Sequence, residues 1–317
     1  MAGWGGLSEM AQTPLPPFSG GSRPARLRWA MPTELRAYLL MLPAVGIIVL
    51  LFGGGLVLAF LQSIGLMGLL STGEVSLAAY RAALTNPEFG RSLTLSLAIA
   101  LTATGLSTLL SIGLALLLRS AGRWASLACQ ITLPIPHLVG VTGMLLLLAP
   151  SGFLARILMA LGWVQSDQDF PLLVNDGFNL GVMLHFLWKE IPFITLILLA
   201  VLRGIDPAYE IQARALGATR WQCFWNVTLP MMRSGILSAS LIVFGFIFAS
   251  FEVPFLLGST RPRALPVLVY RAFTDTDLSK RPEAIALGLI LSLISIAIIA
   301  AYLWLTVRPS KPSSLEQ

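Results

Sequence analysis

The sequence predicts an all-α membrane protein with six transmembrane helices. Charged residues make up 11% of the 317 residues and apolar residues 56%, whereas soluble globular proteins carry roughly 25% charged residues. The mean hydropathy is +0.80. Six apolar stretches each approach the ~20 residues that cross a hydrocarbon layer. They are continuous rather than alternating, and lipid cannot satisfy unpaired backbone groups, so helices are the expected spans.

The six predicted spans follow one another without a soluble domain between them. They cover residues 37–61, 91–118, 126–149, 178–202, 234–257 and 283–306. Before them, residues 1–36 contain five glycines and five prolines and lack the apolar core of a signal peptide. We expect a disordered basic cytoplasmic tail there, helical from about Thr33, and a second cytoplasmic tail at 307–317.

The distribution of basic residues predicts the orientation. With both termini in the cytoplasm, the inner segments hold twelve Lys and Arg and the outer segments eight, as the positive-inside rule favours. Topology therefore explains the net charge of +6, and we expect membrane lipid rather than nucleic acid as a partner. The outer loop 258–282 is the exception, because it carries five of the eight outer charges. It could be a docking surface, a gate or a cap on the helices.

Two other outer loops contain helical patterns. In the loop 62–90, residues 76–80 could form a small interfacial helix. In the loop 150–177, the apolar piece Phe153–Leu161 is expected to form a helix along the outer membrane surface.

Several chemistries are excluded by inspection. None of the three lysines follows a glycine, so the chain has no Walker A phosphate loop. His137 and His185 form no HExxH pair, and no GxSxG motif occurs. Cys129 and Cys223 belong to no metal or redox spacing. We therefore expect no catalytic residue, no metal and no cofactor on this chain, and any ATP must bind to another one.

The inner loop at residues 203–233 is the most informative segment. It reads RGIDPAYEIQARALGATRWQCFWNVTLPMMR. Asp206 and Pro207 suit the start of a helix over 208–216, and Gly217 suits a left-handed turn. A second amphipathic helix should follow, with an apolar face of Trp221, Phe224 and Trp225. Pro230 is expected to end that helix before the fifth span.

This loop resembles the EAA loop of the permease subunits of bacterial binding-protein-dependent ABC importers. The family pattern is E-A-A, three residues, G, nine residues and I-x-L-P. Gly217 matches the glycine, Val227–Pro230 match I-x-L-P with Val for Ile, and Ala213 matches the second alanine. Ile211 and Gln212 occupy the Glu and first Ala positions, and a glutamate stands one place earlier, at Glu210. The resemblance covers about residues 37–306 and is nearest to polyamine-, thiamine- or iron-type permeases.

The resemblance implies a type I fold, with a cytoplasmic coupling-helix loop between helices 4 and 5 that transmits ATP hydrolysis from a separate subunit. The residues that it implies for ATPase contact or hinge roles are Glu210, Ala213, Gly217, Ala218 and Trp221. It also implies a second permease subunit (a paralogue or a second copy), two ATP-binding subunits that carry ATP-Mg, and an extracytoplasmic substrate-binding protein. The structural alternative for 203–233 is an interfacial helix pair with snorkelling arginines.

Ionisable residues inside the predicted spans are candidates for the translocation pathway, because burying charge in a membrane is costly. The candidates are Lys189, Glu190 and Glu252, and Pro254 could break the helix near Glu252. Lys189 and Glu190 point ~100° apart on one helix and so each needs another partner. The alternative for Glu252 is satisfaction by a neighbouring helix or by headgroups. His137 and His185 are expected to be structural hydrogen-bonding groups.

The function predicted from the sequence is half of a substrate pathway in the bacterial inner membrane, for a polyamine or another small polar solute. A stand-alone secondary transporter or channel would also explain the spans and the buried charges, but it leaves the EAA-like loop unexplained. An intramembrane enzyme has no supporting Ser/His, paired-Asp or HExxH arrangement.

Overall fold

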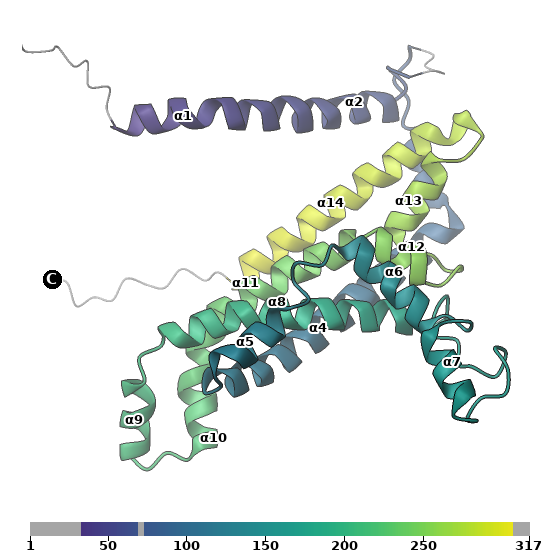
Figure 1. The fold of residues 1–317 in the computed structure, drawn as a ribbon. Helices are drawn as coiled ribbons and strands as arrows, with labels where there is room; N and C mark the ends of the chain where they lie inside the picture. Colours follow the sequence, from purple (N-terminus) through teal and green to yellow (C-terminus); the bar gives the residue numbers. More distant parts are fainter. Residues whose placement is uncertain (1–32, 69–72, 307–317) are drawn as a thin grey trace, which may run out of the picture. The chain divides into compact units, whose positions relative to one another are not determined.

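The structure is a computed structural model that describes residues 33–68 and 73–306. The remainder of the predicted N-terminal tail and the tail at 307–317 lie outside the described residues. Every regular element in the described part of the chain is helical (Figure 1). The chain divides into two compact units, Met1–Gly54 and Gly55–Gln317, which are treated separately.

Six helical segments of the described chain are long and apolar enough to cross a membrane. Their bounds are Tyr38–Ser63, Pro87–Arg119, His137–Ala160, Leu180–Gly204, Arg220–Ala249 and Leu278–Thr306. The predicted number of spans is therefore confirmed, and all but the third and the fifth lie close to their predicted positions. The first comprises α1 (Thr33–Ile48), the π-helical η1 (Val49–Gly53) and α2 (Gly54–Ser63), with α1 beginning at the predicted residue.

Three long helices form the centre of the second unit. They are α4 (Pro87–Arg119), α8 (Leu180–Gly204) and α11 (Leu229–Ala249), and α4 packs most extensively on α8. The buried side of α4 carries Ala and Ser, including Ala100, Ala103 and Ser107. Such small side chains let membrane helices approach closely. Ser111 adds a hydrogen bond from its hydroxyl to the carbonyl of Ile191 on α8, at 2.9 Å.

The third span differs from its prediction. A continuous helix over 126–149 is wrong: α5 (Arg123–Gln130) ends early, a turn follows, and α6 begins at His137 and runs to Leu148. Pro134 and Pro136 lie in the interruption, and proline lacks the N–H and clashes with the preceding turn. By length and hydropathy, the third spanning segment runs from α6 through α7 (Phe153–Ala160), the helix predicted within the loop 150–177.

The fifth span departs from its prediction at both ends. Pro230 does not end the preceding helix, because α10 (Arg220–Cys223) continues through the π-helical η2 (Phe224–Thr228) into α11. The wider π turn accommodates the proline, which provides no N–H for the ordinary ladder. At the other end, α11 stops at Ala249 and α12 (Glu252–Leu257) restarts. The break therefore precedes Pro254, which lies in the first turn of α12, where its missing N–H has no helical partner to lose.

The loop 258–282 is largely ordered rather than a simple loop. It contains α13 (Leu265–Phe273) and η3 (Leu278–Lys280), followed directly by α14 (Arg281–Thr306). α13 packs on α14 and α4, and α14 also packs on α3 (Ala78–Thr85), which lies slightly later than the predicted helix at 76–80. The backbone N–H of Leu265 donates to the hydroxyl of Ser96 at 2.7 Å, which ties α13 to α4.

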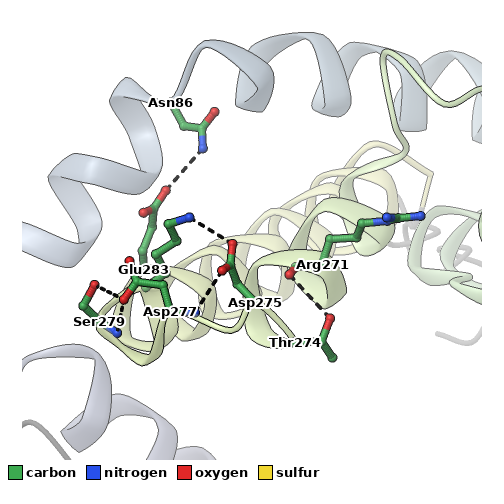
Figure 2. Close-up of polar contacts among 8 residues, drawn as sticks. Asn86, Arg271, Thr274, Asp275, Asp277, Ser279 and Glu283 are labelled. Atoms are coloured by element: carbon green, nitrogen blue, oxygen red, sulfur yellow. Dashed lines mark hydrogen bonds and ion pairs between the residues drawn. The ribbon is translucent and has the colours of Figure 1, made fainter.

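Polar contacts hold the turn between α13 and α14 (Figure 2). Lys280 bonds to the carboxylate of Asp275 at 2.9 Å, and the Asp277 carboxylate accepts from the backbone and hydroxyl of Ser279. Asn86, just before α4, donates to Glu283 on α14 at 3.2 Å. These contacts place α3, α13 and the start of α14 at one end of α4, called here the Pro87 end; the other is the Arg119 end.

Candidate functional site

The predicted two-helix loop lies at the Arg119 end, where α9 (Ala208–Ala215) and α10 extend from the bundle (Figure 1). The Asp206 carboxylate accepts from the backbone N–H of Ala208 at 2.8 Å, so the predicted helix start is confirmed. Gly217 has a φ of +90°, and the predicted left-handed turn is confirmed. The Thr219 hydroxyl and the Gln222 side chain then form a reciprocal capping box at the start of α10.

Glu210 is the most strongly bonded of the predicted coupling residues. Its Oε1 atom accepts hydrogen bonds from Arg119 Nη1 at 2.5 Å and from the Thr228 hydroxyl at 2.8 Å. Burial favours the neutral acid and raises the pKa of Glu210, but the bonds from Arg119 and Thr228 and the charges of Arg119 and Arg214 outweigh it. The pKa of Glu210 therefore lies below its ordinary value of 4.5, and the carboxylate is ionised at neutral pH.

The other predicted coupling residues lie on or beside the same turn. Ala213 and Ala218 are half-buried, whereas Gly217 is exposed. Trp221 is 68% exposed, and its ring packs against those of Phe224 and Trp225, as the predicted apolar face requires.

Two exposed apolar residues of this loop were missed by the sequence reasoning. Leu216 is 90% exposed and Ile211 is 66% exposed. The sequence gives little reason to single them out, because an isolated exposed apolar residue is common on protein surfaces. Together with Trp221, however, they form a group of exposed apolar residues on one short hairpin.

A groove of about 980 Å³ lies between these helices and the Arg119 end of α4. Apolar residues of α4 and the aromatic residues of α10 and η2 line it, together with three arginines. The lining includes Leu109, Ile112, Leu116, Arg119, Glu210, Arg214, Arg220, Trp221, Phe224, Trp225 and Thr228. The lining of this groove holds no catalytic constellation.

Lys189 and Glu190 lie buried on α8, and each has a separate partner, as predicted. The ammonium group of Lys189 donates to three carbonyls of the interruption between α5 and α6, those of Thr132 (2.6 Å), Leu133 (3.2 Å) and Ile135 (2.5 Å). The interruption leaves these carbonyls without a complete helical ladder, and lipid offers no replacement. Lys189 therefore stabilises the broken entry to the third span.

Glu190 faces His137 at the start of α6. The Glu190 Oε1 and His137 Nε2 atoms lie 3.4 Å apart, so His137 has the hydrogen-bonding contact that the structural prediction expects. The same prediction is wrong for His185, whose two ring nitrogens have no hydrogen-bond partner within the described part of the chain. Its buried ring packs beside those of His137 and Trp188, because Gly140 leaves the space that a side chain would occupy.

A pocket of about 440 Å³ opens beside this pair of polar groups. Its walls come from α8, α11 and the residues before and at the start of α6. They are Leu133, His137, Lys189, Glu190, Phe193, Leu196, Ile242, Val243 and Phe246. The structure thus brings Lys189 and Glu190 together in one mainly apolar pocket with a polar wall.

Glu252 does not belong to that pocket. It is the first residue of α12 and is exposed. Within residues 33–68 and 73–306, it takes part in none of the hydrogen bonds or ion pairs between side chains. In the described residues, therefore, no neighbouring helix provides Glu252 with a hydrogen-bond or ion-pair partner, and that alternative is wrong for this part of the chain.

The fold and the two-helix loop agree with a family assignment. The chain belongs to the family described as "binding-protein-dependent transport system inner membrane component", which matches residues 107–310. It is accordingly a multi-pass permease component of the inner membrane, and the predicted resemblance to ABC importer permeases is confirmed.

Individual relatives support the same assignment. The chain is 30% identical over 227 residues to the molybdenum transport system permease protein ModB of Mycobacterium tuberculosis, covering 69% of this chain and 80% of the relative. It is 26% identical over 237 residues to the inner membrane ABC transporter permease protein YnjC of Escherichia coli, covering 73% of this chain and 43% of the relative.

A solved structure shares the fold. A chain of a bacterial ABC transporter involved in the import of the acidic polysaccharide alginate aligns with a TM-score of 0.69 at 21% identity. The alignment covers 88% of this chain and 97% of that one. At this identity the likeness shows the architecture alone, and it confirms the predicted all-α permease fold.

Proposed function

We propose that residues 203–233 couple this permease to a separate ATPase and that the chain forms half of a translocation pathway that works by alternating access. The observation that carries the proposal is the hairpin of α9 and α10, turned at Gly217 and presenting exposed apolar residues at one end of the bundle. The hairpin follows α8 after a short connection and continues through η2 into α11, so a push on it can tilt these membrane helices.

The proposed complex contains a second permease subunit, either a paralogue or a second copy, and two ATP-binding subunits that carry ATP-Mg. An extracytoplasmic binding protein delivers the substrate. One chain supplies one coupling hairpin, so two permeases serve two ATPases. The solved alginate transporter, described in complex with a periplasmic protein bound to an alginate pentasaccharide, supports this kind of assembly.

The proposed pathway uses the membrane-embedded polar groups. Glu190 and Lys189 supply the polar wall of the 440 Å³ pocket, and Glu252 lies exposed at the helix break of the fifth span. The fifth spanning segment ends at Ala249, so Glu252 lies just beyond it, at a mouth of the proposed pathway. An exposed carboxylate close to the hydrocarbon needs water around it, and a water-lined path between two permease subunits would supply that water.

The substrate is proposed only as a small polar solute. Polyamine, suggested by the sequence resemblance, has no counterpart among the proteins named above: ModB is named for molybdenum, the solved structure for alginate, and the name of YnjC refers to no substrate. The proposed orientation has both termini in the cytoplasm, which places the coupling hairpin inside and α13 outside. There the ordered turn shown in Figure 2 offers the binding protein a stable docking surface.

Co-purification tests the proposal. The tagged full-length chain is expressed with candidate ATP-binding subunits of ABC importers from the same genome, and the bound ATPase is quantified. We expect the ATPase to remain with the wild-type chain and with Gly90→Asp, which introduces the same side chain into open space at the Pro87 end. We expect Gly217→Asp to lose it, because Asp strains the left-handed turn. ATP-independent uptake by the reconstituted chain alone would instead indicate a stand-alone transporter or channel.

A further inference from the structure

Glu210 joins three separate segments at the Arg119 end. It lies in the first turn of α9, Arg119 is the last residue of α4, and Thr228 is the last residue of the π turn η2. One carboxylate oxygen accepts from both partners, at 2.5 Å and 2.8 Å. The side chains of Arg119 and Glu210 are only 24% and 29% exposed, and Thr228 is buried.

The position of the glutamate explains this inward bond. In the family pattern the glutamate stands where this chain has Ile211, and Glu210 precedes it by one residue. Successive residues of an α-helix lie ~100° apart around its axis. The shift therefore moves the carboxylate from the face where Ile211 is 66% exposed to the face that meets Arg119 and Thr228.

We propose that Arg119, Glu210 and Thr228 form an internal latch that transmits movement of α9 to the membrane helices, with Glu210 acting as a positioning residue rather than as a contact with the ATPase. The inference rests on the proposed function. The docking contact then belongs to the exposed apolar residues of the hairpin, Ile211, Leu216 and Trp221.

The latch connects α9 to two long membrane helices, α4 and α11, and so can transmit movement over a long distance. α4 has 33 residues, which corresponds to a rod of about 50 Å. At its Pro87 end α4 is tied to α13 through Ser96, and Glu88 lies 3.5 Å from Arg263. Displacement of α9 can therefore reach the opposite end of the bundle along α4, while Thr228 passes it to α11 through η2.

The bond geometry gives the latch its strength. Hydrogen bonds between charged partners are roughly twice as strong as neutral ones. The lowered pKa of Glu210 agrees with an ionised carboxylate held by two donors. Two other arginines, Arg214 and Arg220, line the same groove, and the charge of Arg214 also acts on Glu210.

Hydrogen exchange on the full-length chain in nanodiscs, without any partner, tests whether the latch restrains α9. Arg119→Gln and Glu210→Gln should each accelerate exchange of the α9 amides by about fivefold, as expected for loss of roughly 1 kcal/mol. The swap Arg119→Glu with Glu210→Arg should restore much of the protection. Arg91→Gln is the matched control, because Arg91 is exposed and lies on α4 like Arg119; it should leave the exchange of the α9 amides unchanged.

Two conservative variants of Thr228 separate loss of the latch from misfolding of the chain. Thr228→Val removes the hydroxyl with little change of shape and should accelerate exchange, whereas Thr228→Ser retains the donor and should preserve protection. If none of the latch variants alters α9 exchange, or if the control alters it equally, the latch is refuted.

The assembled complex tests transmission. On addition of Mg-ATP, exchange in α13 at the far end of α4 is compared between wild type and variants. Arg119→Gln and Thr228→Val should keep the ATPase bound but reduce the nucleotide-dependent change by about fivefold, the low end of measured site-to-site couplings. Loss of the bound ATPase on Glu210→Gln, without rescue by the swap, would show a direct contact and overturn the proposal. If the wild-type chain binds no ATPase, the proposed function fails, while the exchange of α9 still decides whether the latch exists.

Discussion

Replacement of Gly217 by alanine should loosen the coupling hairpin without any steric clash. Gly217 has a φ of +90°, and a Cβ atom built there meets nothing within 4 Å. The cost is therefore purely conformational, about 1–2 kcal/mol for an L-residue in the left-handed region. That free energy corresponds to a factor of about 5–30 in the equilibrium between the formed and opened turn.

Amide hydrogen exchange of peptides covering residues 208–223 measures this equilibrium. Exchange in Gly217→Ala should be about 5–30 times faster than in wild type where local opening controls it. Gly217→Asn should lie between the two, because asparagine tolerates left-handed backbone better than alanine does. The chain itself places Asn175 and Asn179 at φ of 57° and 58°.

Gly204→Ala is the matched control in the same loop. A Cβ atom at Gly204 also meets nothing within 4 Å, but its φ is not in the left-handed region. Since alanine is a better helix former than glycine, exchange of the amides in residues 208–223 should be unchanged or slower in Gly204→Ala. Equal acceleration by Gly204→Ala and Gly217→Ala, or no acceleration by either, would refute the argument from backbone conformation.

Three further outcomes are expected. Lys189→Met should lower the melting temperature of the detergent-purified chain, since each carbonyl left unpaired costs about 1–3 kcal/mol; an unchanged melting temperature would show that the carbonyls need no partner. Gly140→Ala should also destabilise, by about 1–3 kcal/mol, because its Cβ would lie 2.9 Å from the ring of Trp188, whereas Gly143→Ala meets open space and should melt like wild type. The stabilisation by Glu210, measured as the melting difference from Glu210→Gln, should be complete above pH 4.5 and decline only as the pH falls through the lowered folded-state pKa; a decline near neutral pH would contradict the lowered pKa.

Much of the coupling hairpin could be predicted from local sequence. Asp206 at a helix start and Gly217 at a left-handed turn act through their own backbone neighbourhood. Their roles therefore appear in the sequence as residue type and spacing. The partners of Glu210 could not be predicted, since Arg119 lies 91 residues away and is brought close only by the packing of α4 beside α8.

Proline behaviour was the weakest part of the prediction, for a related reason. Pro230 was expected to end a helix, but a π turn carries the helix past it. The span predicted at 126–149 is interrupted instead, and the freed carbonyls find the ammonium group of Lys189. Whether a proline stops, kinks or passes through a helix depends on which groups elsewhere can satisfy the backbone, which is a property of the assembled bundle.

The sequence by itself determined that this chain crosses a membrane as six helices and carries a two-helix loop turned at Gly217, because hydrophobic length and local turn chemistry require no distant contact. Tertiary structure decided where the few membrane-embedded charges go. It placed Lys189 on broken backbone and Glu190 beside His137 within the spans, and Glu210 between Arg119 and Thr228 in the loop outside them. In a medium without water each polar group must find its partner within the protein, and only the packing of helices distant in sequence supplies those partners.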